Sequence, residues 1–234
     1  MASYPRYAIY YAPDPGSVLD RFGVELIGYD AHQGLDVPFP SGIGLPTDWQ
    51  EITGDPRKYG FHATLKAPIV LAPGRRESEL LAACEAFAAT PRAIPLIKPI
   101  IDTIDGFMAI IAETRCPDLQ DFAADCVREF DGFRAPLTDE DRSRRKPSKL
   151  SPRQRGYLDR WGYPYVFDEF RFHMTLTGRL DAERQPRLRD LLRSRFLECG
   201  VTQLLIDRLA LFRQDEPDRR FQVVGRWPLW RATP

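Results

Sequence analysis

Two of the chain's three histidines lie in the same five-residue pattern, Phe-His-x-Thr-Leu. The first copy contains His62 and the second contains His173, and matching flanks of this kind rarely arise by chance. The ordinary imidazole pKa of ~6.5 lets a histidine both accept and donate a proton near neutral pH. Two histidines that face one ligand could therefore act as base and acid in the same reaction, as the in-line cleavage of a phosphodiester requires.

The threonine of each pattern extends this chemistry. Side chains alternate across a strand, so each histidine shares a face with the threonine two residues later, while the phenylalanine and leucine anchor the other face in a core. A threonine hydroxyl can donate to a phosphate oxygen, and a nearby lysine or arginine can neutralise the charge. A phosphate ester is therefore the expected ligand. On this reasoning the phosphate would be held by Thr64, Thr175, Arg171 and Lys66.

A structural role is the main alternative for the two motifs. One histidine on the polar face of a strand is usually a surface residue or a hydrogen-bonded structural one. Two copies with identical flanks favour a catalytic or ligand-binding role instead, because core packing does not require His-x-Thr twice. A metal site built from both histidines lacks an accompanying set of carboxylates or cysteines, so we expect neither a metal nor another cofactor.

The elements that must position these residues follow from hydrophobic periodicity and turn signals. Each motif is expected on a strand that is followed by a helix and then by two strands, an order that suggests an internal duplication. Strands are expected at residues 7–11, 59–70, 96–101, 107–112, 169–178, 204–212 and 219–227. Helices are expected over residues 77–89 and from Ser17, Pro117, Ser151 and Asp181, with a long ordered loop at 34–55 and an exposed connector at 139–149.

Other side chains could line the same site. Tyr7 and Tyr11 could stack on a base or a sugar, with packing in the core as an equal alternative. Lys58 and Tyr59 precede the first motif and are expected at the mouth of the cleft. The third histidine, His32, has no hydroxyl partner and lies in a loop sequence, so we expect it at the surface.

Composition limits the class of protein. The chain has 234 residues, of which 43% are hydrophobic and 28% charged, with a net charge of zero; this fits a folded protein and argues against an indiscriminate nucleic-acid coat. The basic run within residues 139–149 could clamp a polyphosphate or an RNA backbone, but such a run more often forms a solvated loop. No apolar run approaches the ~20 residues of a membrane span, and no signal peptide is evident, so we expect a cytoplasmic protein without a membrane partner. The oligomeric state does not follow from the sequence, and a monomer is the favoured expectation.

The paired motifs resemble those of the 2H phosphoesterase superfamily. The stretch from Leu150 to Leu180, which contains the second motif, is similar to one bacterial branch, the DUF1045 group, whose members are described as phosphonate-metabolism proteins. The resemblance covers essentially the whole chain. It implies one bilobal α+β domain over residues 1–234, with two antiparallel sheets related by pseudo-twofold symmetry around a central cleft and helices on the outside. The lobes would span roughly residues 1–135 and 150–234, each with one motif strand, and strands could exchange between them.

The same resemblance implies an activity. It assigns His62 and His173 as the acid and base pair, and Thr64 and Thr175 as phosphate holders, of a metal-independent 2H-type cyclic phosphodiesterase. Its expected substrate is a small cyclic phosphate, for example a phosphoribosyl cyclic phosphate in phosphonate catabolism. The alternatives are an RNA-end-processing 2′,3′-cyclic phosphodiesterase or ligase-like enzyme, and a module that binds a phosphate ester or an RNA end without catalysis. Which histidine is the base, and which substrate is used, stay open.

Overall fold

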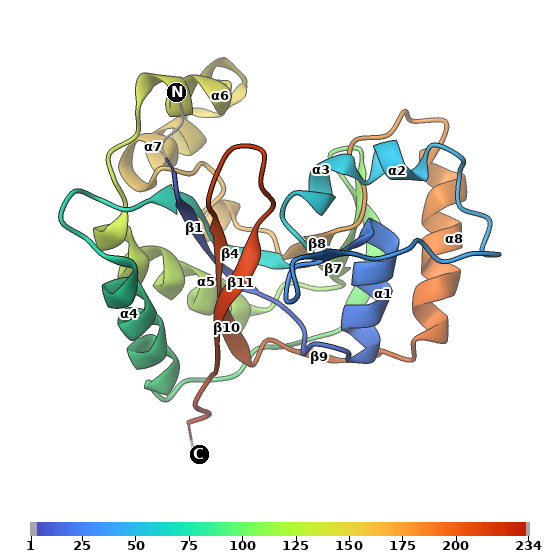
Figure 1. Ribbon diagram of the computed structural model, residues 1–234, viewed down its shortest axis with the longest axis horizontal. Coiled ribbons are helices and arrows are strands. Elements are labelled where there is room, and N and C mark those ends of the chain that lie inside the picture. Colours follow the sequence, from blue (N-terminus) through green and yellow to red (C-terminus); the bar gives the residue numbers. More distant parts are fainter. Residues whose placement is uncertain (1–3, 233–234) are drawn as a thin grey trace.

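A seven-stranded antiparallel sheet runs through the molecule in the computed structural model, which describes residues 4–232 (Figure 1). Its strand order is β11-β10-β1-β4-β8-β7-β6. The strands are β1 (Arg6–Tyr11), β4 (Ala63–Val70), β6 (Pro99–Ile104), β7 (Phe107–Ala112), β8 (His173–Thr175), β10 (Arg208–Gln214) and β11 (Gln222–Pro228). Two small two-stranded sheets pair β2 (Tyr29–Asp30) with β3 (Leu35–Asp36) and β5 (Leu96–Ile97) with β9 (Leu204–Leu205).

Four helices cover one face of this sheet. Buried side chains of α1 (Val18–Ile27), α4 (Glu77–Ala89), α5 (Pro117–Phe130) and α8 (Gln185–Glu198) join one hydrophobic core with the side chains of that face. In Figure 1, α4 and α5 lie on one side of the molecule and α1 and α8 on the other. The remaining helices are α2 (Trp49–Ile52), α3 (Gly54–Arg57), α6 (Asp139–Arg144) and α7 (Pro152–Trp161), with 3-10 turns at Asp131–Phe133, Pro147–Lys149 and Phe167–Glu169. The opposite face carries a smaller buried cluster, which includes Tyr10, Phe212 and Phe221, beside the polar side chains of the two motifs.

Local sequence signals explain where several elements begin and end. The Ser17 hydroxyl accepts from the backbone N–H of Asp20 and caps α1, which ends at Gly28 in the left-handed conformation. Ser151 caps α7 in the same way, as predicted. The β6–β7 hairpin turns at Asp105 and Gly106, where both φ angles are positive, as a two-residue hairpin turn requires.

The α+β class is confirmed, but the expectation of two antiparallel sheets was wrong. One sheet is continuous because β8 pairs with β4 on one side and with β7 on the other. The predicted order of strand, helix and two strands is present twice, as β4, α4, β6, β7 and as β8, α8, β10, β11. The last two strands extend the sheet beside β1, whereas β6 and β7 extend it beside β8.

Segments without a long apolar periodicity differ most from expectation. The predicted loop at 34–55 contains α2, and the predicted connector at 139–149 contains α6, which Thr138 caps through its hydroxyl. Helices of four to six residues are too short to show a periodic stripe. The second motif strand, β8, covers only residues 173–175 of the expected 169–178, and a 3-10 turn at Phe167–Glu169 includes the expected first residue. Within residues 4–232, none of the helices has the length and apolar character to span a membrane.

Candidate functional site

The two His-x-Thr motifs meet on adjacent strands at the centre of the sheet (Figure 1). Ala63 of β4 pairs with Met174 of β8 in an antiparallel register, and both side chains are buried on the face that the helices cover. In such a ladder the neighbours of a pair lie opposite each other. His62 therefore lies opposite Thr175, and Thr64 lies opposite His173, on the other face.

Both histidine rings are held in the same orientation. The Nδ1 atom of His62 lies 2.9 Å from the carbonyl oxygen of Gly60, and that of His173 lies 2.8 Å from the carbonyl oxygen of Arg171. A carbonyl oxygen can only accept, so each Nδ1 carries the hydrogen and donates it. In the neutral ring Nε2 then keeps its lone pair, and the Thr64 hydroxyl, 3.3 Å away, can donate to Nε2 of His62. Nε2 is thus the atom that each ring offers to a ligand.

The surroundings favour the neutral form of both rings. The pKa of His62 is lowered to about 4, mainly by burial and to a smaller extent by His173, against the opposing effect of the Gly60 carbonyl. Burial also lowers the pKa of His173. The ring of Tyr10 stacks on His62 with 3.8 Å between centroids, and Phe107 lies 5.8 Å from the His173 ring. In the unliganded protein at pH 7 both rings are therefore proton acceptors.

Two adjoining cavities open on these four side chains, and we call them together the histidine cleft. The larger, about 400 Å³, is lined by Thr64 and His173, and the smaller, about 220 Å³, is lined by His62 and Thr175. Phe107 lines both. Each cavity thus receives the histidine of one motif and the threonine of the other.

Two arginines supply positive charge to the cleft. Arg171 lines the larger cavity, as the sequence predicted, and Arg179 lines both. Each is exposed and neither forms an ion pair with another residue in the range 4–232. Sequence reasoning missed Arg179. Its even spacing from His173 was the available signal, but the expected strand ended one residue before it.

Lys66 does not reach the cleft, contrary to prediction. The register between β1 and β4 shifts between the pairs Tyr10–Thr64 and Ile9–Lys66, which inserts one extra residue into β4. Such a bulge turns the next side chain to the other face. Lys66 is consequently buried beneath α5, where its Nζ lies 2.7 Å from a carboxylate oxygen of Asp131.

Tyr7 and Tyr11 also lie away from the cleft. Both are buried in the helix-covered core, and the Tyr7 hydroxyl donates to Glu77 at 2.7 Å. Strand alternation explains the difference, because Tyr10 occupies the opposite face of β1 and stacks on His62 instead. The aromatic side chain beside the motif is thus Tyr10, the residue before the predicted Tyr11.

Of the two residues expected at the mouth of the cleft, Tyr59 and Lys58, only Tyr59 lines it. Tyr59 lines the smaller cavity and stacks on Phe221 with 5.3 Å between ring centroids. Lys58 does not line either cavity of the cleft; its exposed Nζ lies 3.1 Å from Asp55, which does line the smaller one. Tyr59 is therefore part of the wall, whereas Lys58 lies outside it.

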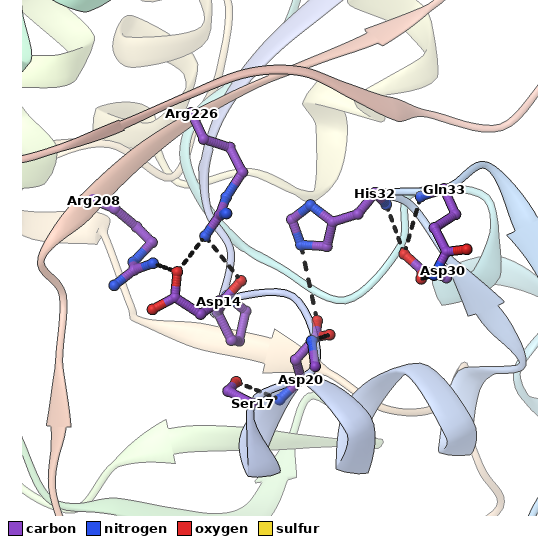
Figure 2. A network of polar contacts seen from close by, with 10 residues as sticks. Asp14, Ser17, Asp20, Asp30, His32, Gln33, Arg208 and Arg226 are labelled. Atoms are coloured by element: carbon purple, nitrogen blue, oxygen red, sulfur yellow. Dashed lines mark hydrogen bonds and ion pairs between the residues drawn. The ribbon is translucent and has the colours of Figure 1, made fainter.

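His32 lies in a buried polar network rather than at the surface (Figure 2). Its side chain is only 11% exposed, and Nε2 lies 3.9 Å from a carboxylate oxygen of Asp20. Burial raises the pKa of Asp20 to about 6 and lowers the pKa of His32. Asp30 fixes the loop by accepting from the His32 backbone N–H at 2.7 Å. Across residues 4–232, His, Cys, Asp and Glu side chains form no group of three or more that could hold a metal ion.

Comparison with known proteins gives one family and two named relatives. Residues 64–222 match the family described as "Protein of unknown function (DUF1045)". The chain is 35% identical over 231 residues to a protein of Janthinobacterium sp. (strain Marseille), covering 97% of this chain and 51% of the relative. It is 32% identical over 219 residues to a protein of Laribacter hongkongensis (strain HLHK9), covering 93% and 50%. Both relatives are named "Ribose 1,5-bisphosphate phosphokinase PhnN", and the chain spans about half the length of each.

These names contradict the predicted activity. A phosphokinase transfers a phosphoryl group to its substrate, whereas the predicted hydrolase would open a cyclic phosphodiester. The assignment as a cyclic phosphodiesterase was therefore wrong. The expected family match, in contrast, is confirmed.

Proposed function

The chain belongs to the DUF1045 family of proteins of unknown function, and from this premise we propose that it binds a ribose phosphate in the histidine cleft and exchanges protons with it through His62 and His173. The observation that carries the proposal is the antiparallel pairing of Ala63 with Met174, which puts each histidine opposite the threonine of the other motif. The identical backbone bonds of the two rings support it, since both fix Nδ1 and leave Nε2 as the proton acceptor; at His62 the ligand would take the place of the Thr64 hydroxyl at Nε2.

The side chains of the cleft suit a phosphate group. The hydroxyls of Thr64 and Thr175 can donate to phosphate oxygens, and the guanidinium groups of Arg171 and Arg179 can neutralise their charge. A bound phosphate also favours a protonated imidazole, because opposite charges stabilise each other in a partly buried site. One ring would then donate a proton to a phosphate oxygen while the other, still neutral, accepts one from a hydroxyl.

The sugar is proposed from the relatives. Both are named for ribose 1,5-bisphosphate, and the chain corresponds to about half of each. The nucleotide-binding pattern G-x-x-x-x-G-K-[ST] does not occur in the 234 residues. We accordingly propose a sugar phosphate, and not a nucleotide donor, as the ligand of this chain. The paired motifs also support the wider resemblance to the 2H superfamily.

Titration calorimetry with ribose 5-phosphate tests the proposal. We expect His62→Ala and His173→Ala each to weaken binding by about 10-fold or more, since a charged hydrogen bond is worth about 1.5–3 kcal/mol. His32→Ala removes the third histidine, which does not line the cleft, and should leave the affinity within about twofold. Binding that is equally strong in both cleft variants would contradict the proposal, as would equal binding of unphosphorylated ribose.

Proton linkage provides a second readout. Because the pKa of His62 is lowered to about 4 in the free protein, binding of a dianionic phosphate should raise it and take up protons at pH 6–7. The measured enthalpy should then depend on the ionisation enthalpy of the buffer, and the affinity should fall as the pH rises from 6 to 8. Absence of proton uptake in the wild type would remove the acid–base part of the proposal.

A further inference from the structure

A second cavity lies over the same strand as the histidine cleft. It has a volume of about 210 Å³ and is lined by the last residues of β4, from Pro68 to Val70, whereas Thr64 at the start of β4 lines the cleft. We call it the arginine cavity, because its lining includes the side chains of Arg6, Arg134, Arg144 and Arg145.

Two of these guanidinium groups have no carboxylate partner in the part of the chain that the structure describes. Arg6 donates to the amide oxygen of Gln214 at 3.0 Å, and its guanidinium lies 5.5 Å from the ring centroid of Phe221. Arg145 is exposed and lies over the ring of Tyr163 at 4.9 Å. Both contacts leave the positive charge unneutralised, so the two groups stay free to bind an anion.

The remaining charges do not cancel this excess. Arg134 pairs with Asp131 at 2.9 Å, but the same carboxylate also pairs with Lys66. Arg144 pairs with Asp141, the one acidic side chain of the lining. The single negative charge of Asp131 is therefore shared by Arg134 and Lys66, and the cavity as a whole carries a net positive charge.

The arginine cavity adjoins the histidine cleft. Tyr59 lines both this cavity and the part of the cleft that contains His62. Tyr163, beneath Arg145, lines the larger part of the cleft. Tyr10, which stacks on His62, lies close enough to Arg6 and Arg145 for their charges to lower its pKa against the larger effect of burial. A single small ligand could therefore contact both sites.

We propose that the arginine cavity holds the second phosphate of a doubly phosphorylated sugar whose first phosphate lies in the histidine cleft. This inference rests on the proposed function and defines its substrate class as a sugar bisphosphate. A phosphate is the favoured anion because planar guanidinium groups bind its oxygens in pairs. The small lined volume suits one phosphate group rather than the backbone of a polymer.

Calorimetric titration with ribose 1,5-bisphosphate and ribose 5-phosphate tests this assignment. We expect the wild type to bind the bisphosphate at least about 10-fold more tightly than the monophosphate. Arg145→Gln, an exposed position where the fold is not at risk, should weaken bisphosphate binding by about 10-fold, and Arg6→Gln/Arg145→Gln by about 100-fold. Monophosphate binding should stay within about twofold. Arg187→Gln, which removes an exposed arginine of α8 that lines none of these cavities, should change neither.

The outcomes separate the two proposals. If His62→Ala weakens the monophosphate but the wild type binds both sugars equally, the arginine cavity is not a phosphate subsite and the proposed function stands. The inference is also overturned if Arg145→Gln weakens both ligands alike, because the charge would then act on the whole cleft. If neither sugar phosphate binds the wild type, both proposals fail.

Discussion

At the scale of single residues, the orientation of His62 depends on Gly60. The Gly60 carbonyl accepts from Nδ1 of His62, and the glycine has a φ of +78°, in the left-handed region. A Cβ at this position would lie 2.5 Å from the Cβ of Ala31. Any side chain here would both strain the backbone and displace the loop that holds the ring.

We therefore expect Gly60→Ala to lower the free energy of unfolding by about 2–4 kcal/mol, from backbone strain and overpacking together. It should also weaken ribose 5-phosphate binding, because the His62 ring loses its fixed Nδ1 partner. Urea unfolding and nitrogen-15 NMR of the imidazole Nδ1–H measure the two effects.

Gly74→Ala is the matched control. Gly74 has a φ of +83°, but a Cβ there would meet nothing within 4 Å. This variant should lower the free energy of unfolding by the backbone strain alone, about 1–2 kcal/mol, and leave the NMR signal of the His62 Nδ1–H unchanged. Equal costs for the two variants would show that the contact with Ala31 has no part in holding the site.

At the scale of helices and strands, the sequence predicted the features that depend only on neighbouring residues, such as the ends of helices. The apolar stripe of α4 predicted its bounds at residues 77 and 89, and the serine caps predicted where α1 and α7 begin. The bulge in β4 could not be predicted in this way, since it exists only in the pairing of β4 with β1. The same bulge decides that Thr64 faces the cleft and Lys66 does not. The predicted alternation therefore held for His62 and Thr64 and failed at Lys66, two residues later.

The packing of α1 against the first motif gives a prediction at this scale. Gly23 lies in α1, and a Cβ there would lie 2.1 Å from the ring of Phe61, the residue before His62. Gly23→Ala should destabilise the protein by about 1–3 kcal/mol, although alanine favours a helix, because the Phe61 ring has no room to yield in the core.

Gly156→Ala tests the same substitution without the contact. Gly156 lies in α7, and a Cβ there would meet nothing within 4 Å. This variant should be stabilised by about 0.5–1 kcal/mol, the ordinary difference in helix propensity. Thermal or urea unfolding of both proteins measures the signs. A stabilised Gly23→Ala would mean that Phe61 is not held against α1.

At the scale of the whole molecule, the two faces of the sheet have different roles: one forms the core and the other carries the candidate site. One face packs under α1, α4, α5 and α8, and the other presents the paired motifs and the arginine cavity. The sequence predicted which side chains of each motif share a face, because that depends only on the pleat. It did not predict that the two motif strands are neighbours in one sheet, since strand pairing across the chain leaves no local signal.

The buried network around His32 links the stability of the whole fold to pH (Figure 2). Burial raises the pKa of Asp20 to about 6, from 3.8 in the unfolded chain. The folded state therefore binds this proton more tightly, and the stability that the proton contributes is lost as the pH rises through 6. At pH 8 the ionised carboxylate is a cost, which His32, with its lowered pKa, does not offset as a cation.

Asp20→Asn should remove this cost while keeping the acceptor for the backbone N–H of Gly16, which lies 2.8 Å from the carboxylate. We expect the variant to exceed the wild type in unfolding free energy by about 2–3 kcal/mol at pH 8, with the difference falling towards zero near pH 4. Asp218→Asn, at an exposed carboxylate, should show no such trend. Urea unfolding across this pH range measures the difference between the two proteins. A difference that does not shrink as the pH falls would show that the ionised Asp20 carboxylate is not its source.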